Sequence, residues 1–398
     1  MKKIMILGAS ILQLPAIKQA KKMGHQVIAV DMDPLAIGFS VEGVIKEVIS
    51  TIDKEAVLYA AIKHNIDGIM TLASDMPMQT IAYISGKLKL PSISVSSSIK
   101  VTNKRYMREA LKKENIPIPL FAASDNLKSL KPLAKKIFNK NIKCILKPAD
   151  SSGSRGVNLI ESIDELESAF YNSQEYSKSG YVMLEEYMVG AEVSVESITY
   201  ENECNVIQIT DKMTTGAPNF VEMGHSQPSR NTKDIKESII QLTKAATKVL
   251  GINYGPSHTE IIITKDGPKI VEIGARLGGD NITSHLVPFS TGVNMIENCI
   301  KLALSEAPNL IKEYNNGSAI RYIKADHGEI VSIEGIEKAR EISNIKEVVI
   351  VNDKLSKPIK SSTDRIGYVI AQAENAEIAV EACEKALSYI KVGVKSIV

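Results

Sequence analysis

Two glutamates, Glu260 and Glu272, stand on either side of a predicted hairpin turn and have the chemistry to bind a metal ion together. The turn is Lys265-Asp266-Gly267, a three-residue loop in which the glycine takes the left-handed position. This loop pairs Thr264 with Pro268 and sets Glu260 directly opposite Glu272 on one face of the hairpin. Facing carboxylates among apolar residues repel each other, and a cation between them removes that cost. Carboxylate oxygens beside nucleotide phosphates suit Mg²⁺.

The register of this hairpin stays open, because a second turn also fits the residues. With a two-residue Asp-Gly turn the pairing shifts by one residue, and the two glutamates then point to opposite faces. We favour the three-residue loop. Arg276 follows the second glutamate closely, and its planar guanidinium is suited to hold a phosphate or a carboxylate through two parallel hydrogen bonds.

A second candidate site is a run of small residues between two predicted strands, with Lys147 before it as a compact cation suited to phosphate. Small side chains let backbone N–H groups approach phosphate oxygens, and serine hydroxyls add donors. A P-loop would require a lysine after its second glycine and an immediate helix, so we expect instead a hairpin that folds over phosphates. A solvated surface hairpin is the alternative. The members of the run are Ser151, Ser152, Gly153, Ser154, Arg155 and Gly156.

The elements that must position these residues fall into three predicted regions. In residues 1–101, short apolar runs alternate with helical stretches, which predicts a Rossmann-like domain with a parallel sheet. In residues 102–312, longer strands separated by short turns and flanked by helices predict an α+β domain that carries both candidate sites. Residues 313–398 predict a small C-terminal α+β domain. The expected fold class is therefore α/β and α+β, multidomain.

Composition and charge restrict the class of protein. The 398 residues are 44% hydrophobic and 24% charged, as in an ordinary globular protein. The 48 basic and 46 acidic residues give no support for a nucleic-acid or membrane partner. The four cysteines form no C-x-x-C pair, which favours buried thiols in a reducing cytoplasm. We expect a cytoplasmic protein with small-molecule partners, and a homodimer is left open.

Together these features resemble the ATP-grasp superfamily of carboxylate–amine ligases over nearly the whole chain. The run Thr102–Leu111 looks like the start of that family's ATP-binding region, and Leu184–Glu192 looks like its adenine hinge. The resemblance implies that Glu260 and Glu272 bind magnesium and that Arg276 acts beside the γ-phosphate and the acyl phosphate. It implies that Lys104, Lys147 and the small-residue loop contact the phosphates of ATP. The adenine base would be contacted by Glu185 and by the backbone of Glu186, Tyr187 and Met188, and the ribose hydroxyls by Glu192.

Within the superfamily, the run Glu272–Gly279 looks most like dipeptide-forming L-amino acid ligases. Glycinamide ribonucleotide synthetase and the carbamoyl phosphate synthetase units share the architecture. Many members have asparagine two residues after the second glutamate, where this chain has Gly274, so Asn281 is a candidate third magnesium ligand. The candidate residues for binding the acceptor substrate lie in a long polar stretch expected to be a loop, residues 211–231, and near the two glutamates. They are Lys212, Glu222, His225, Ser229, Arg230, His258, Arg276 and Gly279.

The implied reaction uses ATP and Mg²⁺, with Mn²⁺ as an alternative, to form an amide or peptide bond through an acyl phosphate. The catalytic residues would be Arg276 and Lys147. One alternative is a phosphoribosylamine–glycine ligase or a carbamoyl-phosphate-synthetase-like enzyme of nucleotide metabolism. Another is a non-catalytic module that binds ATP and releases no ADP. A nicotinamide dehydrogenase is disfavoured, because the glycine pattern that begins at Gly8 is broken at both later glycines.

Overall fold

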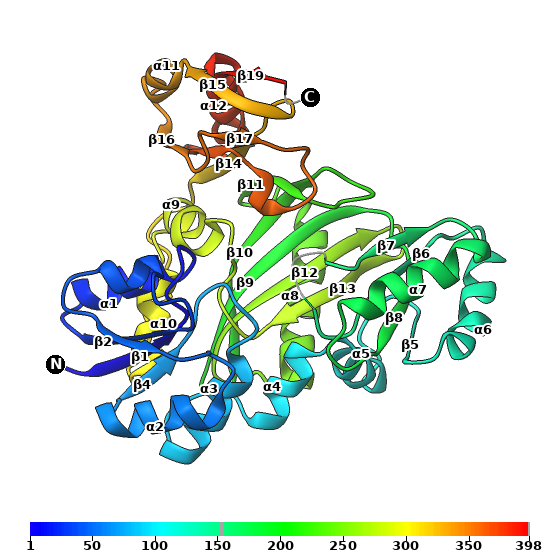
Figure 1. The fold of residues 1–398 in the computed structure, drawn as a ribbon, viewed down its shortest axis with the longest axis horizontal. Helices are drawn as coiled ribbons and strands as arrows, with labels where there is room; N and C mark the ends of the chain where they lie inside the picture. Colours follow the sequence, from blue (N-terminus) through cyan, green and yellow to red (C-terminus); the bar gives the residue numbers. More distant parts are fainter. Residues whose placement is uncertain (152–154, 397–398) are drawn as a thin grey trace.

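The computed structural model describes residues 1–151 and 155–396 (Figure 1). Ser152, Gly153 and Ser154, part of the predicted phosphate loop, lie outside the described residues. The mixed α/β and α+β multidomain class expected from the sequence is confirmed. Among the described helices, none is long and apolar enough to cross a membrane.

The N-terminal region is built on a parallel sheet in the order β3-β2-β1-β4. Alternate residues of β1 pack into different cores, Ile4 and Ile6 on one face and Met5 and Leu7 on the other. Burial on both faces explains why its strands read as continuous apolar runs. The elements are β1 (Lys3–Leu7), α1 (Leu14–Lys22), β2 (Gln26–Asp31), β3 (Ile45–Val48), α2 (Lys54–His64), β4 (Gly68–Met70) and α3 (Met78–Leu88).

Two helices lead into a small sheet of order β5-β8-β6-β7, which lies at the right of Figure 1. Strands β6 and β7 pair antiparallel, with Leu146 opposite Asn158, so the expected strand–loop–strand hairpin is confirmed. The elements are α4 (Val95–Thr102), α5 (Lys104–Lys113), β5 (Phe121–Ser124), α6 (Leu127–Phe138), β6 (Cys144–Pro148), β7 (Asn158–Ile160), α7 (Leu166–Glu175) and β8 (Val182–Glu186).

The large antiparallel sheet runs in the order β13-β12-β9-β10-β11-β14-β18-β16 and extends from the middle of Figure 1 to the C-terminal region at its top. The expectation of a long polar loop over residues 211–231 is wrong, because most of it is the β10–β11 hairpin with Lys212 opposite His225. Lys212 and Glu222 of this hairpin line a cavity beside Glu260, and such polar residues hide the apolar alternation of a strand. The elements are β9 (Ala191–Tyr200), β10 (Glu203–Thr214), β11 (Glu222–Gln227), α8 (Lys233–Leu250), β12 (Gly255–Thr264), β13 (Gly267–Gly274), α9 (Val287–Thr291) and α10 (Met295–Ala303).

The C-terminal region continues this large sheet rather than standing apart from it. Strand β14 pairs with β11, and β18 and β16 follow. The sheet is therefore continuous across the boundary proposed at residue 313, and the division into 1–101, 102–312 and 313–398 remains a proposal. The elements are β14 (Gly317–Ile323), β15 (Gly328–Glu334), α11 (Ile336–Arg340), β16 (Ile345–Ile350), β17 (Leu355–Ser356), β18 (Gly367–Ala373), α12 (Ala376–Tyr389) and β19 (Lys391–Lys395).

Candidate active site

The β12–β13 hairpin settles the register of the two glutamates. Thr264 pairs with Gly267 across a two-residue turn, so the predicted three-residue loop is wrong. The register then shifts at a β-bulge: Ile261 lies opposite Ile270, whereas Glu260 lies opposite Glu272. Val271 is the extra residue of β13, and an extra residue of this kind re-aims the side chains beyond it. The predicted pairing of Glu260 with Glu272 is confirmed, although a bulge rather than the turn produces it.

The two glutamates stand between two cavities. One, of about 190 Å³, is lined by Lys104, Lys147 and the segment from Glu185 to Met188. The other, of about 200 Å³, is lined by His258, Arg276 and Asp75 among others. Both Glu260 and Glu272 line both cavities. A cation held by the pair would therefore touch the contents of the two cavities at once.

Lysines approach each glutamate. Asn103 caps α5 by accepting from the backbone N–H groups of Arg105 and Tyr106, and this fixes Lys104 at the start of the helix. Lys104 Nζ donates to the backbone oxygen of Ser151 at 2.8 Å and to Glu272 at 3.0 Å. Lys104 and Ser151, both predicted phosphate ligands, therefore meet beside the predicted metal ligand Glu272.

Lys212 neutralises the other glutamate. Its Nζ lies 3.4 Å from Glu260, 3.4 Å from Glu222 and 3.7 Å from Glu192. The ammonium holds the pKa of Glu260 well below its usual range, and burial raises the pKa of Glu192. One buried cation thus joins the predicted ribose ligand to the predicted metal ligand.

A buried ion-pair chain lies behind the predicted hinge. Glu185 accepts from Arg108 Nε at 2.8 Å and lies 2.7 Å from Lys147 Nζ. Burial alone would raise the pKa of Glu185, but these two cations lower it to about 2. Arg108 Nη2 also donates to the backbone oxygen of Val271 at 2.7 Å. Arg108 therefore connects the hinge to the bulge that turns Glu272 toward Glu260.

His258 is a cation on the face that carries the glutamates. Its Nδ1 lies 2.6 Å from a carboxylate oxygen of the fully buried Glu196, and its Nε2 lies 3.6 Å from Glu260. Burial would lower the pKa of His258, but Glu196 and Glu260 raise it to about 9. The two carboxylates therefore favour the protonated form of the imidazole.

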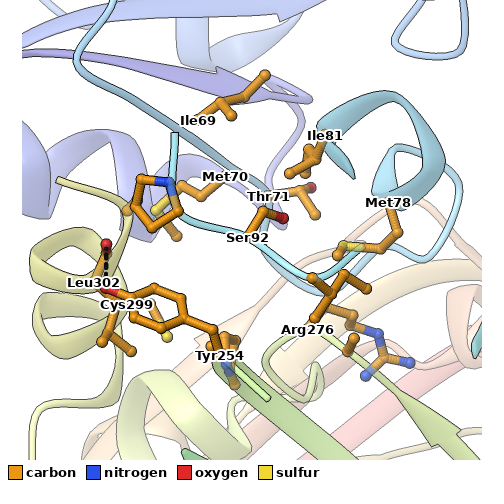
Figure 2. Close-up of a pocket in the computed structure, with 16 residues that line it drawn as sticks. Ile69, Met70, Thr71, Met78, Ile81, Ser92, Tyr254, Arg276, Cys299 and Leu302 are labelled. Carbon is orange, nitrogen blue, oxygen red and sulfur yellow. Dashed lines mark hydrogen bonds between the residues drawn. The ribbon is translucent and has the colours of Figure 1, made fainter. Parts of the chain in front are cut away.

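Arg276 reaches this face from the segment after β13, and Asp75 from the loop before α3 pairs with it. Behind Arg276 lies a mostly apolar cavity of about 60 Å³, lined by Ile69, Met78 and Tyr254 among others (Figure 2). Figure 2 shows the guanidinium pointing away from this cavity, so that the aliphatic part of the side chain forms its wall. The apolar surroundings thus direct the charge toward Asp75.

Several predicted residues lie apart from the facing glutamates. Arg230 is half exposed and pairs with Asp211. Gly279 and Asn281 line a different cavity of about 350 Å³, which lies between the N-terminal and C-terminal regions. Gly156, with φ of +70°, packs against Tyr176 at the base of the predicted loop.

His225 is buried beneath Asp280 at 3.5 Å, and Asp280 forms a bidentate pair with Arg365 at 2.8 Å for each bond. Ser229 is buried, and its hydroxyl accepts from Asn231. The structure thus separates the acceptor-side candidates into those beside the glutamates, such as His258, and those outside that cluster.

Three residues of this site were not predicted from the sequence: Asp75, Arg108 and Glu196. A signal existed for Arg108, because it lies on the same helical face as Lys104, four residues earlier, and next to the buried Met107. Asp75 lies in an irregular loop, where no periodic pattern could have singled it out.

The donor chemistry of the facing pair fits a divalent cation. Among the described residues, no three His, Cys, Asp or Glu side chains converge as a metal site. Magnesium is usually bound by one or two carboxylates together with nucleotide phosphates and water, so two facing glutamates beside a lysine-lined cavity suffice.

Comparisons with known proteins agree with this arrangement. Residues 140–284 match the ATP-grasp domain family, and residues 321–395 match the family described as L-amino acid ligase C-terminal domain 2. An L-arginine-specific L-amino acid ligase of Bacillus subtilis is 24% identical over 258 residues, which are 63% of this chain and 62% of that protein. A formate-dependent phosphoribosylglycinamide formyltransferase of Sulfurisphaera tokodaii is 24% identical over 403 residues, 98% of this chain and 97% of that protein.

A solved structure shows the same fold. The crystal structure of an L-amino acid ligase from Bacillus licheniformis has a TM-score of 0.85 at 20% identity, and covers 100% of this chain and 99% of that one. The class is therefore defined: the chain carries an ATP-grasp domain, the fold of enzymes that use ATP and a divalent metal. The chain carries an ATP-grasp domain and a C-terminal domain of the L-amino acid ligase type, and these matches, with relatives named as ligases, support an ATP-dependent carbon–nitrogen ligase.

Proposed function

We propose that this protein activates the carboxylate of an amino acid with ATP and joins it to the amine of a second substrate. The observation that carries the proposal is that Glu260 and Glu272 face each other and line both cavities. A phosphoryl group must pass from one substrate to the other, and the paired carboxylates stand where the two cavities meet.

The first cavity would hold ATP. Its walls include Glu186, Tyr187 and Met188 for the adenine base, Glu192 for the ribose, and Lys104 with Lys147 for the phosphates. Fixed cations and a divalent ion neutralise the charge that spreads over a transferring phosphoryl group, which is the main catalytic requirement of such a step. Glu260 and Glu272 would hold Mg²⁺, or Mn²⁺ in its place.

The second cavity would hold the carboxylate substrate. Arg276 and the protonated His258 supply positive charge there, which suits first the carboxylate and then the acyl phosphate. A carboxylate oxygen attacks the γ-phosphorus, the bond to the leaving ADP oxygen breaks, and an acyl phosphate forms. The amine nitrogen then attacks the acyl carbon, loses a proton, and phosphate leaves. The products are an amide, ADP and phosphate.

An amino acid substrate is supported by the C-terminal match to the L-amino acid ligase family over residues 321–395 and by a relative whose name states amino acid ligation. A purine-biosynthetic substrate is the second candidate, because a relative named phosphoribosylamine–glycine ligase is 24% identical over 324 residues, 73% of this chain. The two candidates share the activation step and differ in the acceptor.

The test is ADP release across a matrix of L-amino acids, each alone and in pairs, with phosphoribosylamine plus glycine as a separate reaction. We expect ADP release that requires an amino acid pair, and a dipeptide detected by mass spectrometry. ADP release confined to phosphoribosylamine plus glycine would replace the amino acid proposal with the purine one. The absence of ADP release with every pair would contradict both.

A further inference from the structure

Asp75 and Arg276 join the N-terminal region to the candidate site. Arg276 Nε donates to Asp75 Oδ1 and Nη2 donates to Asp75 Oδ2, each at 3.1 Å. Their side chains are 18% and 15% exposed, respectively. Asp75 also lines both the cavity that contains Arg276 and a neighbouring one that contains Lys104. This fork-to-fork geometry fixes the plane of the guanidinium more firmly than a single contact would.

Gly274 makes this pair sterically feasible. A Cβ atom built on Gly274 would lie 2.7 Å from Asp75 Oδ1 and 3.2 Å from Arg276 Nε. Gly274 follows Glu272 by two residues in β13, so its side chain would point to the same face as the glutamate. Its φ lies outside the left-handed range, so the backbone does not require glycine. The requirement is space, and Asp75 uses that space.

Without the ion pair to Asp75, Arg276 would be attracted to other carboxylates. The Arg276 side chain is largely buried, and Glu272 and Glu260 follow Asp75 among the groups that raise its pKa. Its aliphatic part rests against the apolar cavity of Figure 2, which restricts the directions open to the charge. A buried charge that loses its partner is strongly disfavoured and moves to another carboxylate. The next carboxylates that act on the charge of Arg276 are those of the facing glutamates.

We infer that Asp75 is a positioning residue: admitted by Gly274, it holds Arg276 away from Glu260 and Glu272 and so keeps that pair free to bind a divalent cation. The inference rests on the proposed function, because it takes the facing glutamates as the metal site. It gives a physical reason for glycine at a position where many ATP-grasp proteins carry asparagine. It also makes the metal site depend on a residue of the N-terminal region.

The test measures Mn²⁺ binding by the electron paramagnetic resonance signal of free Mn²⁺, in the presence of a non-hydrolysable ATP analogue. Asp75→Ala should weaken Mn²⁺ binding about tenfold, in the range found when partners of metal ligands are removed. Gly274→Ala should weaken it similarly, because the added methyl displaces the Asp75 carboxylate. The double variant Asp75→Ala, Gly274→Ala should bind Mn²⁺ no more weakly than either single variant, because both substitutions break the same contact.

A rescue separates positioning from a general structural role. In Asp75→Ala with Arg276→Met, no guanidinium remains to occupy the glutamates, so Mn²⁺ affinity should return to within about twofold of wild type. Gly86→Ala is the matched control, since a Cβ there meets no atom within 4 Å. Thermal unfolding of each variant checks that it is folded. If Asp75→Ala does not fold, Gly274→Ala provides the test of the same contact.

Three results would overturn the inference. If Asp75→Ala and Gly274→Ala bind Mn²⁺ like wild type while Glu272→Gln does not, the inference fails and the proposed metal site stands. If the Arg276→Met rescue leaves Mn²⁺ binding weak, Asp75 acts in some other way and the inference fails. If wild type binds no Mn²⁺ in the presence of the analogue, or if Glu272→Gln binds it equally well, the proposed metal site fails and the inference falls with it.

Discussion

Arg108 donates a 2.7 Å hydrogen bond to the backbone oxygen of Val271, the extra residue in the bulge of β13. The same guanidinium binds Glu185 behind the predicted adenine hinge. A residue with no exposed surface thus connects the nucleotide side of the site to the strand irregularity that makes Glu272 face Glu260.

The first prediction concerns this buried arginine. Arg108→Met leaves the carbonyl of Val271 without its donor and removes one of the two cations that neutralise Glu185. We expect the free energy of unfolding to fall by about 3–5 kcal/mol, as when one partner of a buried ion pair is removed. Urea unfolding measures this, with Lys143→Met as a control at an exposed ion pair, expected to change by less than about 1 kcal/mol. A loss as small as the control's would refute the role assigned to Arg108.

The second prediction concerns the pKa of His258. An NMR titration of wild type should give a midpoint near 9, because Glu196 stabilises the imidazolium. In Glu196→Gln, burial still lowers the pKa of His258 but the carboxylate that raises it is gone, so the midpoint should fall toward or below the ordinary 6.5. Because the folded pKa is raised, the stabilisation is fully present below pH 6.5 and is lost as the pH rises through about 9. A midpoint unchanged by Glu196→Gln would show that another group holds the proton.

The third prediction concerns Lys212, the ammonium shared by Glu192, Glu222 and Glu260. Lys212→Met leaves three carboxylates to repel one another, and we expect a loss of about 3 kcal/mol in the free energy of unfolding. Added Mg²⁺ should recover part of that loss, because it replaces the missing cation, and should affect wild type less. Thermal unfolding with and without Mg²⁺ measures both effects. The exposed Lys244→Met is the control, and equal Mg²⁺ responses in both variants would contradict the prediction.

Much of the fold could be predicted from local sequence patterns. The alternation of strands and helices predicted for residues 1–101 agrees with the structure, and the predicted run Thr102–Leu111 contains the start of the helix Lys104–Lys113. In these segments an apolar period agrees with clear end signals, such as Asn103 at the helix N-cap. The hairpin around residues 211–231 was missed because the candidate site replaces its apolar face with polar residues.

The site was harder to predict than the fold, because its geometry depends on contacts between distant segments. Val271 is held in its bulge by an arginine 163 residues earlier, and Arg276 is paired with an aspartate 201 residues earlier. Repulsion and metal chemistry suggested that Glu260 and Glu272 should face each other, but the turn chosen to explain it was wrong. No local pattern could have supplied the bulge, since the residue that stabilises it lies on another element.

The most direct test of the central claim is ADP release, measured together with hydroxamate formation when hydroxylamine traps the acyl phosphate. We predict that wild type requires a carboxylate substrate and Mg²⁺ for both signals, and that Glu260→Gln and Glu272→Gln each lower both by about 100-fold or more. If either variant released ADP and formed hydroxamate at the wild-type rate, the facing glutamates would not be the centre at which ATP activates the carboxylate.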